Sequence, residues 1–293
     1  MKSNRLFCLI CIFLCATFTG NSQNNFSVAA DSLFLAKDYD AASLLYERAY
    51  FHSGNVDTSA LILLQKVDCL KKTNRNGEIN EVLDRMRYDI LPVSYHARWR
   101  YESALASYIN HDYARAVNEV SIYENFIKDT LFLKDMLLIK TLSYHSTLKL
   151  IEAKESMQKL VAELVHDSVT QLSYFKKIEA LYEDARPVKN PEKGARLSGF
   201  VPGLGQLYAG FPLDAMASAA INAGALTLGI YNVLNGFPIS GYMSGAGLIY
   251  AFYIGGQKRA MFLCEKRNYR TQRELDEEVK KMFNELANYQ LEN

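Results

Sequence analysis

The chain has 293 residues, which allows one large domain or two of ordinary size. Its 33 Lys and Arg residues nearly balance 32 Asp and Glu, and this near-neutral charge argues against nucleic acid as a partner. Only Cys69 and Cys264 lie beyond the first 15 residues, so the sequence predicts neither a disulfide framework nor a cysteine metal site.

The N-terminus has the pattern of a secretory signal. A basic start and an apolar stretch over residues 6–18 are followed by Gly20 and Ser22, the small residues that a cleavage site before Gln23 requires. We therefore expect residues 1–22 to be a signal peptide and the following domain to be exported. An uncleaved anchor helix is the alternative.

Residues 26–185 show helical periodicity almost throughout and no alternating strand pattern, which predicts an all-α domain. Within it, small and aromatic residues recur on one helix face, where alanine lets a neighbouring helix approach and tyrosine fills the adjoining space. The clearest sets are Tyr39, Ala42, Tyr46 and Ala49, and Tyr113, Ala116, Val120 and Tyr123. Weaker sets are Ile79, Val82 and Met86, and Leu150, Ala153, Met157 and Leu160.

These sets begin about 34 to 40 residues apart, the period of a helix–turn–helix repeat. The two clear sets resemble the second helix of the tetratricopeptide repeat, G-x-Y-x-x-A-x-x-x-Y-x-x-A, with Lys37 and His111 in place of its glycine. The resemblance implies a helical-repeat solenoid over residues 26–185, capped by a helix at residues 168–185. An irregular helical bundle is the alternative.

A short linker is expected at residues 186–196. Pro187 and Pro191 interrupt any helix there, and Asn190 and Gly194 favour turns. This composition marks a domain boundary.

Residues 197–257 contain a single formal charge, Asp214. Because a bilayer span needs only ~20 apolar residues, this stretch predicts a membrane domain. We expect transmembrane helices at residues 213–234 and 239–256, joined by a turn into a helical hairpin. Residues 200–210 contain one proline and three glycines and are too broken for a span, so we expect them to lie in the interface or to re-enter the membrane.

Small residues at four-residue spacing mark faces of both expected spans where helices can pack closely. They are Ala215, Ala219 and Ala223 on the first, and Gly241, Gly245, Gly247, Ala251 and Gly255 on the second. Such faces favour the hairpin itself and also allow a homo-oligomer.

The membrane segment starts with the string PGLGQLYAG at residues 202–210. It resembles a small family of bacterial two-helix membrane domains that begin with PGxGQxYxG, and the likeness covers residues 194–268. The family carries no assigned chemistry, so the resemblance implies an architecture and not an activity. The matching residues are Pro202, Gly203, Gly205, Gln206, Tyr208 and Gly210.

Three polar residues within the apolar segment are candidates for a binding site, because polar atoms are costly in hydrocarbon. Gln206, Asp214 and Asn222 form a candidate polar cluster for a lipid head group, an ion or a partner helix. The alternative is structural, with Asp214 at the membrane surface and the two amides hydrogen-bonding across the hairpin.

The tail, residues 258–293, starts with basic residues and continues as a charged amphipathic helix. Two spans place this tail on the same side as the exported array, outside the cytoplasm; a crossing by residues 200–210 would make it cytoplasmic. Helical spans favour the inner membrane, because outer-membrane spans are usually barrels.

No catalytic motif is present: the sequence lacks HExxH, GxxxxGK[ST] and GxSxG patterns, and its histidines are scattered. We therefore expect no enzyme, metal site or cofactor, and no nucleic-acid partner. The leading hypothesis is a membrane-anchored scaffold whose periplasmic repeat array binds a protein or peptide. The alternative is that the membrane module handles a lipid or small solute through its polar residues.

Overall fold

The computed structural model describes residues 22–127, 129–183 and 187–292, so the expected signal peptide lies outside the described residues except for Ser22. The expectation of an all-α fold is confirmed: this part of the chain contains thirteen α-helices, one short 3₁₀ helix and no strand. Most helices pack against the next helix in sequence. The chain divides into two compact units, residues 1–172 and residues 173–293.

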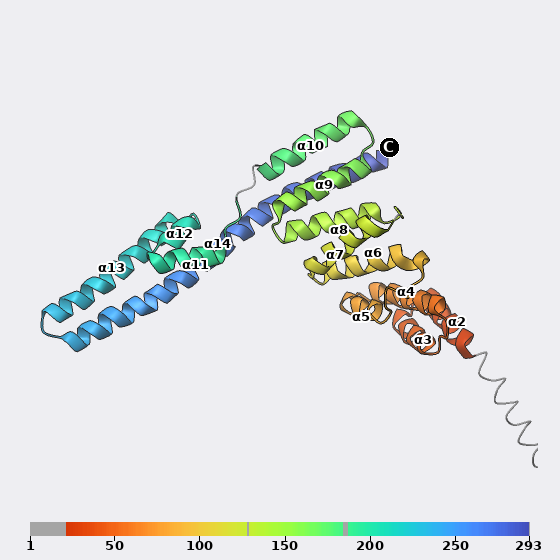
Figure 1. Cartoon of the computed structure of the whole chain (residues 1–293), viewed down its shortest axis with the longest axis horizontal. Coiled ribbons are helices and arrows are strands. Elements are labelled where there is room, and N and C mark those ends of the chain that lie inside the picture. Colours follow the sequence, from red (N-terminus) through yellow and green to blue (C-terminus); the bar gives the residue numbers. More distant parts are fainter. Residues whose placement is uncertain (1–21, 128, 184–186, 293) are drawn as a thin grey trace, which may run out of the picture. The chain divides into compact units, whose positions relative to one another are not determined.

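The first unit is a succession of paired helices (Figure 1). Its helices are α2 (Ser22–Leu35), α3 (Tyr39–Phe51), α4 (Val56–Lys72), η1 (Asn76–Glu78), α5 (Ile79–Leu83), α6 (Val93–Ile109), α7 (Tyr113–Phe126), α8 (Leu133–Ser146), α9 (Leu150–Leu164) and the first turn of α10 (Ser168–Glu183). Within this unit α2 packs on α3, α3 on α4, α6 on α7, α7 on α8 and α8 on α9.

The turns inside the four pairs share one backbone conformation. Their non-glycine residues with positive φ are Lys37, Asn74, His111 and Leu148, so each lies 37 residues after the one before. At all four turns, the backbone N–H of the positive-φ residue donates to the carbonyl of the residue three positions before it. The backbone N–H of the following residue donates to the carbonyl of the residue five positions before that following residue. This is the Schellman motif, which satisfies the last carbonyls of a helix.

Two of these turns also start the next helix in the same way. The carboxylates of Asp38 and Asp112 accept from the backbone N–H groups of Ala41 and Arg115, three residues on. Such caps satisfy N–H groups that have no partner within the helix. The first and third pairs, which have the clearest sequence pattern, therefore share both the end of one helix and the start of the next.

The faces proposed from the sequence lie mostly in the interior. Ala42, Tyr46 and Ala49 are buried, as are Ala116, Val120 and Tyr123, while Tyr39 and Tyr113 are partly exposed. The second pair differs, because its second helix is reduced to η1 and the five-residue α5. Its Ile79, Val82 and Met86 are still buried, in a cluster with residues of α4 and α6.

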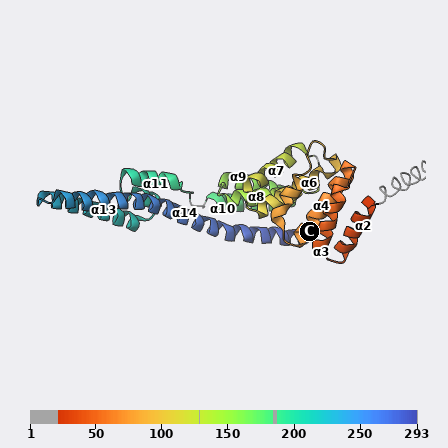
Figure 2. The same cartoon turned by 90° about the horizontal axis from the view of Figure 1, so that it is seen from below.

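The second unit contains the remainder of α10 with α11 (Pro191–Phe200), α12 (Leu204–Tyr208), α13 (Pro212–Leu234) and α14 (Pro238–Glu292). Helix α13 lies beside the first half of α14 (Figures 1 and 2). Asp214, at the start of α13, contacts Arg259, which lies 21 residues into α14. Asn232, near the end of α13, contacts Ser244, which lies only six residues into α14. The two helices therefore run antiparallel.

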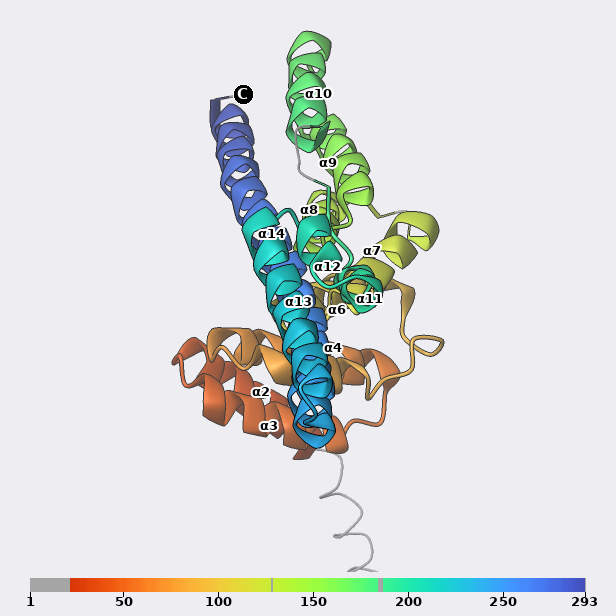
Figure 3. The same cartoon turned by 90° about the vertical axis from the view of Figure 1, so that its left-hand side faces the viewer.

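Helices α11 and α12 pack on one flank of the α13–α14 pair (Figure 3). Helix α11 begins at Pro191, within the range expected as a linker. Asn190 caps it by accepting from the Lys193 N–H, and proline suits the first helical position because it lacks the N–H that would be unpaired there. With ten and five residues, α11 and α12 are too short to span ~30 Å of hydrocarbon.

Helix α14 runs for 55 residues without interruption, so the second expected span and the amphipathic tail form one helix. No proline or turn sequence separates them, and the change from apolar to charged residues does not end a helix. In the tail Leu275, Val279, Met282 and Leu286 are buried. Lys177 of α10 pairs with Glu285 at 2.7 Å, which locates α10 beside the tail.

Helix α13 is the one helix in the described part of the chain that is long and apolar enough to cross a membrane. Its 23 residues exceed the ~20 that a bilayer requires. Only 11% of its most apolar window is buried, in contrast to a core helix of a soluble domain. The second expected span, residues 239–256, does not meet the same criterion of length and hydropathy.

Candidate functional site

The sequence motif at residues 202–210 forms the junction of four helices in the second unit. Gly203 ends the turn between α11 and α12 with a φ of +99°, a conformation that L residues rarely adopt. A Cβ at this position would lie 2.5 Å from the carbonyl oxygen of Ala215 in α13. At Gly205 a Cβ would overlap the Gly194 carbonyl oxygen of α11. Glycine at both positions therefore allows direct contact between backbones.

Gln206 is fully buried and joins three segments. Its Oε1 accepts from the Ser198 hydroxyl at 2.7 Å, and its Nε2 donates to the Gly256 carbonyl of α14 at 3.1 Å. The Ser198 hydroxyl also accepts from the Gly205 N–H at 3.1 Å. The amide thus connects α11, α12 and α14, as a buried polar group must to offset its lost hydration.

The end of the motif is held by polar contacts with α14 and the chain before α11. Gly210 has a φ of +87°, and Arg267 donates to the Ala209 carbonyl beside it at 3.2 Å. The Tyr208 hydroxyl accepts from the Asn190 N–H, while Lys189 and Lys193 lie near the face of the Tyr208 ring. Pro202 is half-buried in the turn.

The three residues of the candidate polar cluster line one cavity of about 220 Å³ between α13 and α14. Asp214 pairs with Arg259, whose two nitrogens lie 3.1 and 2.8 Å from its Oδ1. Asn222 lies two turns further along α13, and its Nδ2 donates to the Ser218 carbonyl. The cavity therefore combines an ion pair, two amides and apolar walls that include Ile221 and Phe252.

The side-chain oxygen of Asn222 is a buried acceptor in this cavity that lacks a hydrogen bond from the described residues. The residue is 9% exposed, and its Oδ1 has no hydrogen-bond partner among the described residues. A buried acceptor without a partner costs about 1–3 kcal/mol. A hydroxyl or N–H group of a small ligand, or a water molecule, would remove this cost.

Sequence reasoning did not identify the partners of the cluster. Ser198, Gly256 and Arg259 lie 8, 50 and 45 residues from the groups that they bind. Arg259 is one of the first cations after the apolar segment, and this position is the one signal that indicated a partner for Asp214. The other two partners depend on the register of α14.

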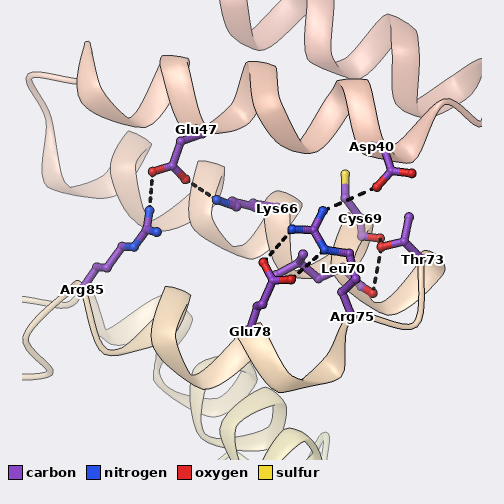
Figure 4. Close-up of polar contacts among 9 residues, drawn as sticks. All are labelled: Asp40, Glu47, Lys66, Cys69, Leu70, Thr73, Arg75, Glu78 and Arg85. Atoms are coloured by element: carbon purple, nitrogen blue, oxygen red, sulfur yellow. Dashed lines mark hydrogen bonds and ion pairs between the residues drawn. The ribbon is translucent and has the colours of Figure 1, made fainter.

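In the first unit, charged side chains connect successive helix pairs (Figure 4). Glu47 of α3 pairs with Lys66 of α4 and with Arg85, which follows α5. Asp84 then pairs with Arg115 of α7 at 2.7 Å. Although burial alone would raise the pKa of the Glu47 carboxyl, the two cations hold that pKa below its ordinary value.

A small cavity also lies in the first unit, between α4, η1 and α6. It has a volume of about 260 Å³ and is lined by Lys71, Asn76 and Glu102 with apolar residues. Glu102 is 3% exposed and accepts from Lys71 at 2.7 Å, while its Oε2 has no hydrogen-bond partner among the described residues.

Two further side chains, Cys69 and Tyr46, have raised pKa values but do not lie in a catalytic arrangement. Burial, reinforced by Asp68, raises the pKa of the Cys69 thiol to about 11, which keeps it protonated and unreactive at neutral pH. Burial, together with the hydrogen bond from its hydroxyl to Asp31, raises the pKa of Tyr46. Among the described residues no group of three His, Cys, Asp or Glu side chains is placed to hold a metal ion.

The chain matches no protein-family model, no curated protein and no solved structure.

Proposed function

We propose that this chain is a non-enzymatic, membrane-anchored scaffold of the bacterial cell envelope, whose exported helical-repeat array binds a protein or peptide. The observation that carries the proposal is the recurrence of one turn geometry at residues 37, 74, 111 and 148. Helical repeats stack so that each unit contacts its neighbours, and the stack offers an extended concave surface to a partner.

The repeat interpretation rests on backbone geometry as well as on residue type. Four turns with the same spacing and the same pair of hydrogen bonds support a tandem array of four helix pairs resembling tetratricopeptide repeats. The ion pairs from Glu47 to Arg85 and from Asp84 to Arg115 support the same conclusion, because the two carboxylates lie 37 residues apart and each pairs with an arginine of the next helix pair.

The anchor of the proposed scaffold is a transmembrane hairpin made of α13 and the first half of α14. Gly229 lies so close to Gly245 that a Cβ on it would come within 2.7 Å of the Gly245 Cα. Asn232 donates to the Ser244 hydroxyl at 3.2 Å. Close small residues and interhelical hydrogen bonds are the interactions that hold helices together in lipid.

The hairpin leaves the array and the tail on the same side, which we propose is the periplasmic face of the inner membrane. Several small residues face outward from the hairpin, and they support a homo-oligomer as a further element of the proposal. The exposed members are Ala219, Ala223, Gly247, Ala251 and Gly255.

The test is crosslinking in cells followed by affinity capture of the full-length protein in mild detergent. We expect one protein to be recovered in near-stoichiometric amount with the full chain and to be lost when residues 26–172 are removed. Ala116→Leu, which places extra volume at a fully buried position, should weaken recovery, whereas Ala114→Leu at a neighbouring exposed position should not. Recovery that is unchanged by the deletion would contradict the scaffold.

A second candidate function rests on the cavity between α13 and α14. The unpartnered Asn222 Oδ1 and the Asp214–Arg259 pair support binding of a small polar solute or a lipid head group there. This function predicts that Asp214→Asn protein inserts normally but loses its cellular activity, while deletion of the array is tolerated. If the array deletion abolishes activity and Asp214→Asn does not, the cavity is not the functional site.

A further inference from the structure

The turn between α11 and α12 exposes a group of large apolar side chains. Phe200 is 84% exposed and Val201 is 55% exposed, and they are followed by Leu204 and Leu207 on one face of α12. The first turns of α13 continue the exposed apolar surface with Leu213 and Met216. So many exposed apolar side chains within 17 residues indicate contact with a protein surface or a membrane.

The contacts of this segment with α14 fix its depth along the α13–α14 pair. Gly199 lies against Tyr253 and Gln257, whereas Asp214 pairs with Arg259. Because an α-helix rises 1.5 Å per residue, Gln257 and Tyr253 are about 3 and 9 Å along α14 from Arg259. The displacement is toward the turn at the far end of α13, so Phe200 lies beyond the ion pair and beside the apolar part of the hairpin.

A band of positive charge borders the apolar segment on both sides in sequence. Residues 187–273 carry nine Lys and Arg residues against three Asp and Glu, a formal net charge of +6, whereas the whole chain has +1. Arg196, Lys258 and Lys266 of this band are exposed. Basic residues next to a membrane segment attract anionic phospholipids.

We propose that the α11–α12 turn inserts its apolar tip, Phe200 and Val201, into the membrane leaflet beside α13, and that the basic band binds anionic phospholipid head groups around it. The inference rests on the proposed membrane anchor, because α13 defines the membrane into which the turn inserts. Its occupant is an anionic lipid leaflet, favoured by the position of the turn beside the candidate span and by the +6 charge.

In this arrangement the motif at residues 202–210 provides hydrogen-bond partners for backbone groups of the inserted turn. A turn that enters hydrocarbon must satisfy its backbone groups within the protein, because lipid offers no hydrogen bonds. The Val201 N–H donates to the Leu197 carbonyl and the Leu204 N–H donates to the Val201 carbonyl. The Gly205 N–H, deeper in the junction, donates to the Ser198 hydroxyl.

The first experiment locates the turn in a bilayer. Phe200→Trp full-length protein is reconstituted into phosphatidylcholine–phosphatidylglycerol nanodiscs whose acyl chains carry bromine, a quencher of tryptophan fluorescence. The parent protein supplies the background from Trp99, its single tryptophan. Leu131→Trp, at a position of the first unit that is 73% exposed, is the control for water, and Tyr242→Trp, 73% exposed on the apolar part of α14, is the control for lipid.

We expect bromine to reduce the added fluorescence at positions 200 and 242 by about half or more and to leave position 131 unchanged. Quenching at position 242 without quenching at position 200 would overturn the inserted turn and leave the anchor in place. Absence of quenching at position 242 would overturn the anchor itself and the insertion with it. If position 200 is shielded both from bromine and from aqueous iodide, a protein surface covers it and the lipid proposal fails.

The second experiment tests the lipid class with the same probe. In equimolar nanodiscs with only one lipid brominated, we expect phosphatidylglycerol to quench position 200 at least about twofold more than phosphatidylcholine does. Replacing Arg196, Lys258 and Lys266 by glutamine, which lowers the formal charge of the band from +6 to +3, should reduce this preference. The matched control replaces Lys72, Lys134 and Lys149, exposed residues of the first unit, and should keep the preference. Equal quenching by both lipids in the parent background would overturn the anionic preference.

Discussion

Both units have residues with positive φ in the turns between their helices, but they place different residue types there. In the first unit these are Lys37, Asn74, His111 and Leu148, none of them glycine. In the second unit they are Gly203, Gly210 and Gly236. A side chain at Lys37 extends into solvent, whereas one at Gly203 would meet the backbone of α13.

The difference shows what sets the distance between helices in each unit. In the first unit clusters of buried apolar side chains lie between the helices, and charged side chains connect the pairs. In the second unit backbones touch directly at glycine, with buried amides such as Gln206 making the polar connections. Side-chain packing tolerates variation at the turns, but backbone contact does not.

The largest effect is expected for Gly205→Ala in the second unit. Its Cβ would overlap the Gly194 carbonyl oxygen, a backbone atom that cannot rotate away, so we expect a loss of about 3 kcal/mol or more. The measurement is the labelling rate of Cys264, a buried thiol beside Gly194, in detergent-solubilised full-length protein. The matched control is Gly247→Ala, where a Cβ would meet nothing within 4 Å. Equal labelling rates for the two variants would contradict backbone contact as the basis of this junction.

A smaller effect is expected for added volume in the first unit. Ala116 is 0% exposed, and Ala116→Leu should lower the free energy of unfolding by about 1–3 kcal/mol, since neighbouring side chains can partly rearrange. Fluorescence of Trp99, which lies in this unit, reports the thermal midpoint. Ala114→Leu, exposed on the same helix, should leave the midpoint within one or two degrees of the parent, or about 0.5 kcal/mol. A loss in Ala114→Leu as large as that in Ala116→Leu would count against the buried face.

These two regions also differ in how far the sequence predicted them. The buried face of α7 could be predicted from the sequence because Ala116, Val120 and Tyr123 follow helical spacing. The sequence also indicated a period of 34 to 40 residues, but it did not give the exact period of 37, because the residues at the four turns have no side-chain property in common. Their conformation is imposed by the packing of the two helices that each turn joins, and this information is not local.

The candidate site shows the same limit. Gln206, Asp214 and Asn222 could be selected because polar residues are rare in an apolar segment, and one cavity brings them together. Their partners Gly256 and Arg259 depend on the antiparallel register of α13 and α14, which no local pattern specifies. The continuity of α14 was missed for a different reason: composition changes at residue 257, while helix propensity does not.

A pH dependence is expected from Glu47, whose folded-state pKa lies below its ordinary value of 4.5 because Lys66 and Arg85 favour its ionised form. The stability from this group is present at pH values above 4.5 and is lost as the pH falls through the lower folded-state pKa. Glu47→Gln should therefore cost about 1 kcal/mol at pH 7 and flatten the acid side of the stability profile.

The measurement is the midpoint of the Trp99 fluorescence transition between pH 7 and pH 3. Glu163→Gln, which changes the charge equally at an exposed position of α9, is the control and should keep the slope of the parent. An unchanged acid slope in Glu47→Gln would mean that the ion pairs around α3 do not stabilise the folded state.

The smallest effect is expected where the two units are made alike, by placing glycine in a turn of the first unit. Lys37 has a φ of +64° and an exposed side chain, so Lys37→Gly removes the steric cost of the left-handed conformation without removing a buried contact. We expect a gain of about 0.5–1 kcal/mol, reduced by the extra freedom of glycine in the unfolded chain. Lys37→Ala keeps the Cβ and should show no gain, which separates backbone strain from loss of the lysine charge. A thermal midpoint that rises equally in both variants would mean that the gain comes from loss of the lysine charge. A rise in the glycine variant alone would show that lysine is strained at this positive φ and that the packing of the first unit holds it there.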